Sequence, residues 1–152
     1  MLAHPRCPCT RASVVELNRL MVLCPRRASV VILFLEPPGC SGKWVRTDLW
    51  RDAAAIPGVR VTADREGKVA KRFGATTSGD TLLYSPDGRL LYHGGLTGSR
   101  GHEGDNAGLE SLVALLDGRE PATQRTPVYG CPLTANRVPQ LSSPVGTSAC
   151  RR

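Results

Sequence analysis

The sequence feature that most constrains the fold is the segment at positions 29–35, Ser-Val-Val-Ile-Leu-Phe-Leu, in which every residue after Ser29 is apolar and most are β-branched or aliphatic. A strand with one face in water alternates apolar and polar residues, so this run predicts a strand buried on both faces. Strands covered on both faces are typical of parallel sheets, in which helices connect successive strands. The run therefore favours an α/β fold.

Segments with helical spacing of apolar residues alternate with strand-like segments along the rest of the chain. Helices are predicted at residues 13–23, 44–55, 65–73 and 109–116, and further strands at 59–63, 81–84 and 90–93. The turn Pro86-Asp87-Gly88 joins the last two strands into an antiparallel hairpin. This order predicts a central mixed sheet with helices on both faces.

Polar residues at the predicted helix starts supply candidate N-caps. Ser13 and Glu16 have the spacing of a capping box, and Thr10 is a second candidate for the start of the first helix. Asp64 is placed to cap the helix after the 59–63 strand. Asp105 or Asn106 is placed to cap the last helix.

The net charge of +7 is concentrated at the two ends of the chain. Residues 121–152 hold four Arg and no acidic residue, whereas basic and acidic residues nearly balance between positions 28 and 120. No folded basic face interleaved with aromatic residues is visible, so nucleic acid is not an expected partner. No apolar run is long enough to span a bilayer either.

The composition divides the chain into three parts. Residues 1–118 are predicted to form one domain, and residues 119–133 an extension that docks on it. Residues 134–152 have no periodicity and hold Pro139 and Pro144 among small polar residues, so we expect a disordered basic tail.

A Cys-Pro-Cys sequence comes directly before the first predicted helix. Free backbone N–H groups and the helix dipole favour a thiolate there, so Cys7 is predicted to attack and Cys9 to resolve through a strained Cys7–Cys9 disulfide. Pro8 limits the backbone between them. Arg11 and the neighbouring Arg6 add positive charge that lowers a thiol pKa.

His4 is a candidate base or hydrogen-bond partner for this dithiol. Cys131, in the extension, is a second candidate for the resolving thiol, with an unreactive buried thiol as the alternative. Cys24 and Cys40 are expected to fill core or loop positions, and Cys150 is expected to have no role. The six cysteines do not have the spacing of a disulfide framework or of a structural zinc site.

Two segments resemble the thioredoxin superfamily: residues 59–95, ending in a hairpin with an Asp-Gly turn and a Gly-Gly pair, and residues 6–17 around the cysteines. The Cys-Pro-Cys arrangement is most similar to the bacterial RedB-like branch. The resemblance implies a three-layer sandwich with a truncated first strand. It also implies an antioxidant-type thiol–disulfide oxidoreductase with no cofactor, whose partners are protein thiols or disulfides, or small-molecule thiols.

The chain departs from the family pattern at three points. The motif is Cys-x-Cys, not Cys-x-x-Cys, and residues 77–79 (Thr77, Ser78 and Gly79) form the loop facing the dithiol, where relatives have a cis-proline at the position of Gly79. The first strand has only residues 1–3 to occupy. A missing upstream segment would fit a periplasmic or membrane-anchored protein; otherwise a cytoplasmic one is expected.

Two other readings stay open. Cys7 and Cys9, with His4 or His102, are soft ligands that would suit copper(I) or zinc in a redox accessory protein. A non-catalytic interaction module of the same fold is the second reading. The glycine-rich residues 94–106 lack the spacing of a phosphate-binding loop and are expected to be structural.

Overall fold

The computed structural model describes residues 1–133; the predicted disordered tail, 134–152, lies outside the described residues. The strands and helices alternate along most of this part of the chain. The strands are β1 (Leu2–Ala3), β2 (Val30–Glu36), β3 (Val59–Arg65), β4 (Thr81–Tyr84) and β5 (Leu90–Gly94). The helices are α1 (Pro8–Leu23), α2 (Gly42–Val45), α3 (Asp48–Ala54), α4 (Lys68–Arg72) and α5 (Ala107–Leu116).

The first three strands form a parallel sheet in the order β1-β2-β3, with Ile32 of β2 opposite Val61 of β3. The predicted α/β class is therefore confirmed. The hairpin β4–β5 is antiparallel, as predicted, but it forms a separate two-stranded sheet. A single antiparallel bridge, Leu2 to Asp80, connects it to β1, because β1 offers only two residues for pairing.

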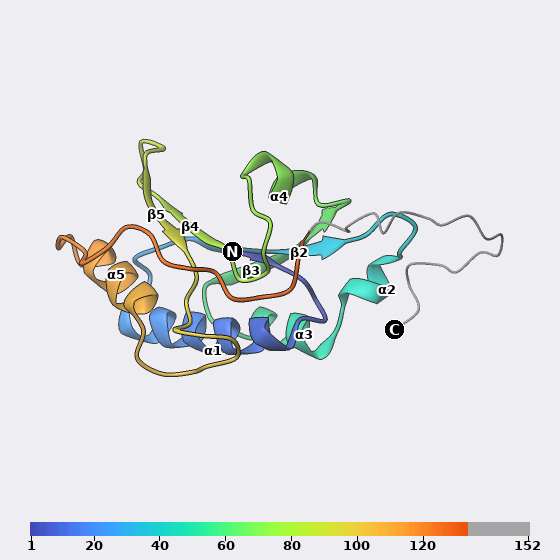
Figure 1. The fold of residues 1–152 in the computed structure, drawn as a ribbon, viewed down its shortest axis with the longest axis horizontal. Helices are drawn as coiled ribbons and strands as arrows, with labels where there is room; N and C mark the ends of the chain where they lie inside the picture. The colour runs from blue at the N-terminus through green and yellow to red at the C-terminus, as the bar shows by residue number, and fades with distance from the viewer. Residues whose placement is uncertain (134–152) are drawn as a thin grey trace.

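Helices pack on both faces of the parallel sheet, with α1 and α3 on one side and α4 on the other (Figure 1). Alternate residues of β2 point to opposite faces. Ile32 and Phe34 belong to a core that includes Leu17, Leu20 and Leu112 from the helices. The other face holds a smaller cluster of Leu2, Leu35, Ala70, Ala75 and Leu133.

Three helix predictions differ from the structure, and in one of them α4 begins at Lys68, since Arg65 belongs to β3. The first helix begins at Pro8, not at Ser13, and Cys7 is its N-cap residue. The Glu16 carboxylate accepts the N–H of Gly104 at 2.6 Å, so it joins α1 to the glycine-rich loop and makes no capping box. The single helix predicted over residues 44–55 is two short helices, α2 and α3, separated at Arg46 and Thr47.

Two predicted caps are confirmed. The Asp64 carboxylate accepts the N–H groups of Val69 and Ala70, each at 2.8 Å, which positions α4. The Asn106 side chain accepts the N–H of Leu109 at 2.8 Å and so begins α5. Asp64 lies within β3 and reaches α4 past Gly67, the residue before that helix, whereas Asn106 is itself the N-cap residue of α5.

The C-terminal segment, residues 124–133, returns across the molecule after α5 (Figure 1). The carbonyl of Gln124 accepts the N–H of His93 at 3.0 Å, and the Thr126 hydroxyl lies 2.5 Å from that of Tyr92. Further along, Leu133 donates its N–H to the carbonyl of Thr76 at 2.8 Å. The segment is therefore held at both ends.

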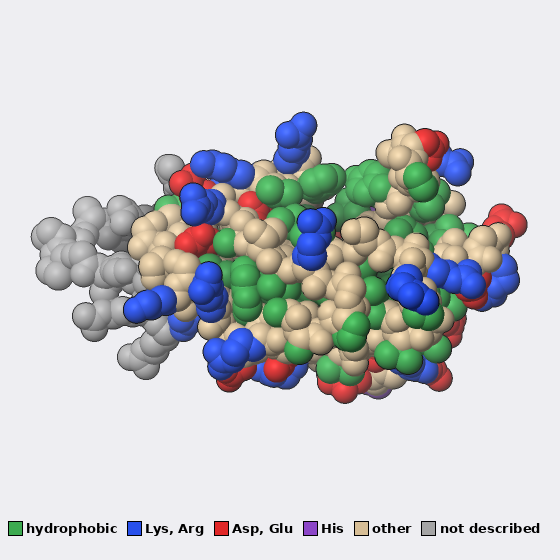
Figure 2. Space-filling view, turned by 180° about the vertical axis from the view of Figure 1, so that it is seen from behind, with side chains coloured by type: hydrophobic (Ala, Val, Ile, Leu, Met, Phe, Trp, Pro, Cys, Tyr) green, Lys and Arg blue, Asp and Glu red, His purple; other side chains and the backbone are tan. Residues whose placement is uncertain are grey.

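The charged side chains are spread over the surface. Figure 2 shows Lys and Arg scattered around a broad area of hydrophobic and uncharged side chains, without one dense basic patch on that face. None of the helices within residues 1–133 is long and apolar enough to cross a membrane.

Replacing Asp64 with Ala is expected to destabilise the protein by about 1–3 kcal/mol, because two amides at the start of α4 lose their acceptor. Urea denaturation measures this loss. Asp48→Ala is the matched control, since Asp48 begins α3 with an exposed side chain paired only with Arg51, and its loss is expected to stay below about 0.5 kcal/mol. Equal losses would contradict the capping role of Asp64.

Candidate functional site

Three segments that are distant in the sequence meet at the N-terminus of α1. They are the β1–α1 junction with Cys7, the facing loop (residues 77–79), and Cys131 of the C-terminal segment. The loop before Cys7 is held by the Thr47 hydroxyl, which donates to the carbonyl of Pro5 at 2.8 Å. Pro8 occupies the first turn of α1, where its missing N–H costs no helical hydrogen bond.

Two buried hydroxyls link the facing loop to α1. The backbone N–H of His4 donates to the Ser78 hydroxyl oxygen at 2.7 Å, and the Ser78 and Thr10 oxygens lie 2.5 Å apart. Thr10 in turn hydrogen-bonds the Cys7 sulfur through its side chain. Since Thr10 has one hydroxyl hydrogen and gives it to the sulfur, its oxygen accepts the hydrogen of Ser78.

This arrangement favours the thiolate form of Cys7. Burial, the largest effect, acts to raise the pKa of the thiol, because Cys7 is only 2% exposed. Hydrogen bonds from the side chains and backbones of Thr10 and Cys131 outweigh burial and lower the pKa from 9.0 to about 7. The Cys7 thiol therefore ionises more readily than an ordinary cysteine near neutral pH.

Cys131 contacts the Cys7 sulfur twice. Its backbone N–H donates to the sulfur at 3.2 Å, and its thiol forms a second hydrogen bond to the same atom. Burial raises the pKa of Cys131, and the hydrogen bond to Cys7 with the charges of Cys7 and Cys9 raises it further, to about 11. Cys131 therefore holds its proton while Cys7 is ionised.

Cys9, the predicted resolving thiol, is a half-buried free cysteine on the first turn of α1. It lies two residues from Cys7, and side chains at that spacing do not face each other on a helix. Its charge reaches Cys131, whose pKa it helps to raise. Cys24 is also free, but it is buried at the opposite end of α1.

The charged groups near the motif have other partners. The Arg6 guanidinium lies over the ring of Trp44, and Arg11 forms an ion pair with Asp52 at 2.9 Å. The groups that lower the pKa of Cys7 are the hydrogen-bond donors of Thr10 and Cys131, whereas the sequence had suggested the two arginines.

His4 contributes mainly through its backbone. Its carbonyl accepts the N–H of Cys7 at 3.1 Å, and its N–H holds Ser78. The ring lies edge-on to Trp44, and Nδ1 accepts the N–H of Arg6. Burial and the charge of Arg6 lower the pKa of His4, so the ring is neutral at neutral pH.

The facing loop is fixed from two sides. Gly79 donates its N–H to the carbonyl of Leu2 at 2.8 Å, and Thr77 forms an antiparallel bridge with Pro132. Gly79 has φ +96°, and an added Cβ would lie 3.0 Å from the Ser13 hydroxyl. A side chain at this position is therefore strained, which explains why glycine occupies it.

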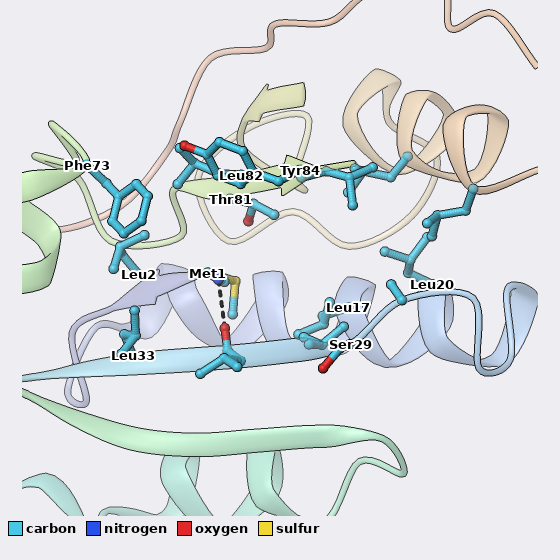
Figure 3. A pocket seen from close by; sticks show the side chains of 16 residues that line it. Met1, Leu2, Leu17, Leu20, Ser29, Leu33, Phe73, Thr81, Leu82 and Tyr84 are labelled. Carbon is cyan, nitrogen blue, oxygen red and sulfur yellow. Dashed lines mark hydrogen bonds between the residues drawn. The ribbon is translucent and has the colours of Figure 1, made fainter. Parts of the chain in front are cut away.

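A pocket of about 480 Å³ opens beside Cys7, which is one of its lining residues. Arg6, Pro8, Arg11 and Asp48 contribute to its walls. A second pocket, of about 340 Å³, is apolar and lies between β2 and β4, with the Met1 amino group donating to the carbonyl of Val31 (Figure 3). None of the cysteines within residues 1–133 lines the second pocket.

Metal ligands do not cluster in the described part of the chain. Within residues 1–133 no three His, Cys, Asp or Glu side chains come together in a group that could hold a metal ion. The structure thus adds no support to the hypothesis that Cys7 and Cys9 bind copper or zinc.

Thr10 is the functional residue that the sequence reasoning did not assign to the site. It was considered only as a helix cap, although it stands three residues after Cys7, where a first-turn hydroxyl faces the N-cap residue. That spacing is the signal that could have identified it.

Comparisons with known proteins show the fold alone. No protein-family model and no curated protein matches the sequence. Among solved structures, the chain is similar to an uncharacterized conserved protein from Geobacillus kaustophilus, with a TM-score of 0.69, 24% identity, and coverage of 90% of this chain and 76% of that one. A hypothetical protein from Sinorhizobium meliloti gives a TM-score of 0.63, 22% identity, and coverage of 90% and 78%.

Thr10→Val is expected to raise the pKa of Cys7 from about 7 toward 9, since the thiolate loses a donor. A rise of one unit would lower the rate of Cys7 alkylation by iodoacetamide at pH 7 roughly fivefold. The pH dependence of alkylation, followed by peptide mass spectrometry in a Cys9→Ser background, measures it. Thr62→Val, at an exposed site on β3, is the control; an unchanged midpoint for Thr10→Val would contradict the hydrogen-bonded thiolate.

Proposed function

We propose that this chain is a thioredoxin-like thiol–disulfide redox protein in which Cys7 is the attacking nucleophile. The observation that carries the proposal is the Cys7 thiol itself, with a pKa of about 7 at the N-terminus of α1 and a second thiol in contact with its sulfur. Thiol–disulfide exchange requires these parts: a thiolate, a second thiol and an entry for the partner. The pocket beside Cys7 is the entry.

The order of elements agrees with the proposed thioredoxin-like fold. A strand leads into the cysteine motif and α1, a parallel sheet follows, and an antiparallel hairpin comes after the facing loop. In parallel α/β sheets reactive groups gather at the carboxyl ends of the strands, and Cys7 follows β1 in this position. The RedB-like assignment rests on the Cys-Pro-Cys motif and remains part of the proposal.

The facing loop has a different proposed role from the cis-proline loop of the family. The Ser78 hydroxyl supports the thiolate through Thr10, and the N–H of Ser78 is already donated to the carbonyl of Cys131 at 2.8 Å. A partner's backbone would therefore compete with residues 131–133 for this edge. We expect small disulfides, which need no backbone pairing, to react more readily than extended polypeptides.

Cys7→Ser is expected to abolish exchange of the reduced protein with glutathione disulfide, with a loss of at least about a hundredfold, because a serine hydroxyl is not ionised at neutral pH. Release of glutathione, measured by an enzyme-coupled assay, follows the reaction. Cys24→Ala is the control, since Cys24 lies at the far end of α1, and its rate is expected to stay within about twofold of the unaltered protein.

Full activity of Cys7→Ser would overturn the proposal. If neither the unaltered protein nor Cys24→Ala exchanged with glutathione disulfide at any pH between 6 and 9, a non-catalytic interaction module would be the better account of the fold.

A further inference from the structure

We propose that Cys131, rather than Cys9, is the thiol that resolves the mixed disulfide on Cys7. This inference rests on the proposed function and names the second catalytic residue of the same site. It would make the active dithiol a pair from opposite ends of the described chain, 124 residues apart.

The first argument is contact. The Cys131 thiol already hydrogen-bonds the Cys7 sulfur, and the Cys131 N–H donates to that atom at 3.2 Å. The two sulfur atoms are therefore neighbours before the reaction starts. Cys7 is the extended N-cap residue and Cys9 the second residue of α1, so a disulfide between them would close a very short, strained loop.

The second argument is the position of residues 130–133. Two hydrogen bonds with residues 76–78 hold them: Ser78 N–H to the carbonyl of Cys131 and Leu133 N–H to the carbonyl of Thr76, each at 2.8 Å, which together make the antiparallel bridge between Thr77 and Pro132. Leu133 is 3% exposed in the smaller core cluster. Cys131 is thus held against the nucleophile by backbone pairing and by a buried anchor.

Gly130 shows how closely the segment approaches the facing loop. A Cβ at this position would lie 1.9 Å from the carbonyl oxygen of Ser78, which is backbone and cannot move independently. Only glycine allows the backbone at position 130 to approach residue 78 this closely and so to place Cys131 beside Cys7.

The third argument is that Cys131 holds a proton which the thiolate released in the first step can accept. The Cys7 thiolate attacks one sulfur of a disulfide R–S–S–R, which forms Cys7–S–S–R and releases RS⁻. The charge on Cys7 is then gone, and with it the interactions with Cys7 that helped to raise the pKa of Cys131. Cys131 passes its proton to the released thiolate and attacks the Cys7 sulfur.

The second step forms the Cys7–Cys131 disulfide and releases a second RS⁻. In total, Cys7 and Cys131 lose two electrons and one proton, R–S–S–R gains both electrons, and one RSH and one RS⁻ leave. The substrate disulfide is the oxidant, so the reaction balances without a further cofactor. In reverse, the same steps oxidise two partner thiols to a disulfide and return Cys7 and Cys131 to the reduced form.

Peptide mapping after reaction with glutathione disulfide tests the inference directly. Trypsin cuts after Arg6, Arg11, Arg125 and Arg137, so Cys7 and Cys9 share the peptide 7–11 and Cys131 lies in 126–137. We expect these two peptides to be joined by a disulfide, and to be joined still in Cys9→Ser. A closed disulfide within peptide 7–11 alone would overturn the assignment.

The two resolving candidates also serve as matched variants. Cys131→Ser is expected to accumulate the Cys7–glutathione adduct and to release the second glutathione at least about tenfold more slowly, whereas Cys9→Ser should change this rate less than about twofold. Circular dichroism and thermal unfolding check the fold of each variant. The opposite ranking, or equal rates, would overturn the role of Cys131 and leave the proposed function intact. Absence of any adduct on Cys7 in all three proteins would instead overturn the proposed function.

A third comparison keeps both thiols and moves only the backbone. Gly130→Ala should separate Cys131 from Cys7, slow release of the second glutathione at least about fivefold, and shift the midpoint of Cys7 alkylation to higher pH. Gly42→Ala is the control, because a Cβ there meets nothing within 4 Å. Unchanged rates in Gly130→Ala would contradict delivery of Cys131 by this segment.

Discussion

The site depends on the pairing of residues 131–133 with residues 76–78. Both N–H groups of this short ladder have partners at 2.8 Å, and the same backbone that completes the ladder donates a hydrogen bond to the Cys7 sulfur. Without this pairing, the Cys7 thiol would lose the hydrogen bonds of Cys131 that, together with those of Thr10, lower its pKa against the effect of burial. The C-terminal segment is therefore part of the site and not an appendage to the domain.

Burial of Cys7 opposes ionisation of its thiol, and the hydrogen-bond donors around the sulfur favour it. The donors have the larger combined effect on the pKa. The sulfur is almost inaccessible, yet side chains and backbones from two segments donate to it. Thr10 is itself supported by Ser78, and Ser78 by the backbone of His4. A charge stabilised by directed hydrogen bonds needs no neighbouring cation, which is consistent with the engagement of Arg6 and Arg11 elsewhere.

The sequence predicted the features that depend on local patterns. The unbroken run at β2, the Asp-Gly turn of the hairpin and the caps at Asp64 and Asn106 each depend on a few adjacent residues, and the structure confirms them. The start of α1 was wrong, because the Ser13–Glu16 spacing offered a capping box and Glu16 instead binds the N–H of Gly104, 88 residues away.

The contacts of Cys131 could not be predicted in the same way. Its approach to Cys7 joins residues 124 apart, and it depends on a close backbone contact at Gly130 that leaves no periodic pattern. The resemblance placed Cys7, Cys9 and Ser78 at one end of the sheet, and the closeness of Cys9 to Cys7 in the sequence favoured Cys9 as the resolving thiol, with Cys131 as the second candidate. The contact between Cys131 and the Cys7 sulfur in the folded protein is the reason why we propose Cys131.

A redox titration of Cys7 tests the central claim most directly. The protein would be equilibrated in glutathione buffers of stepped potential and trapped with acid, and its free Cys7 thiol counted by mass spectrometry. The account predicts one reversible two-electron transition, in which the Cys7 thiol disappears as an intramolecular disulfide forms. A Cys7 thiol that stays reduced across the series, or that ends only as a glutathione adduct, would contradict it.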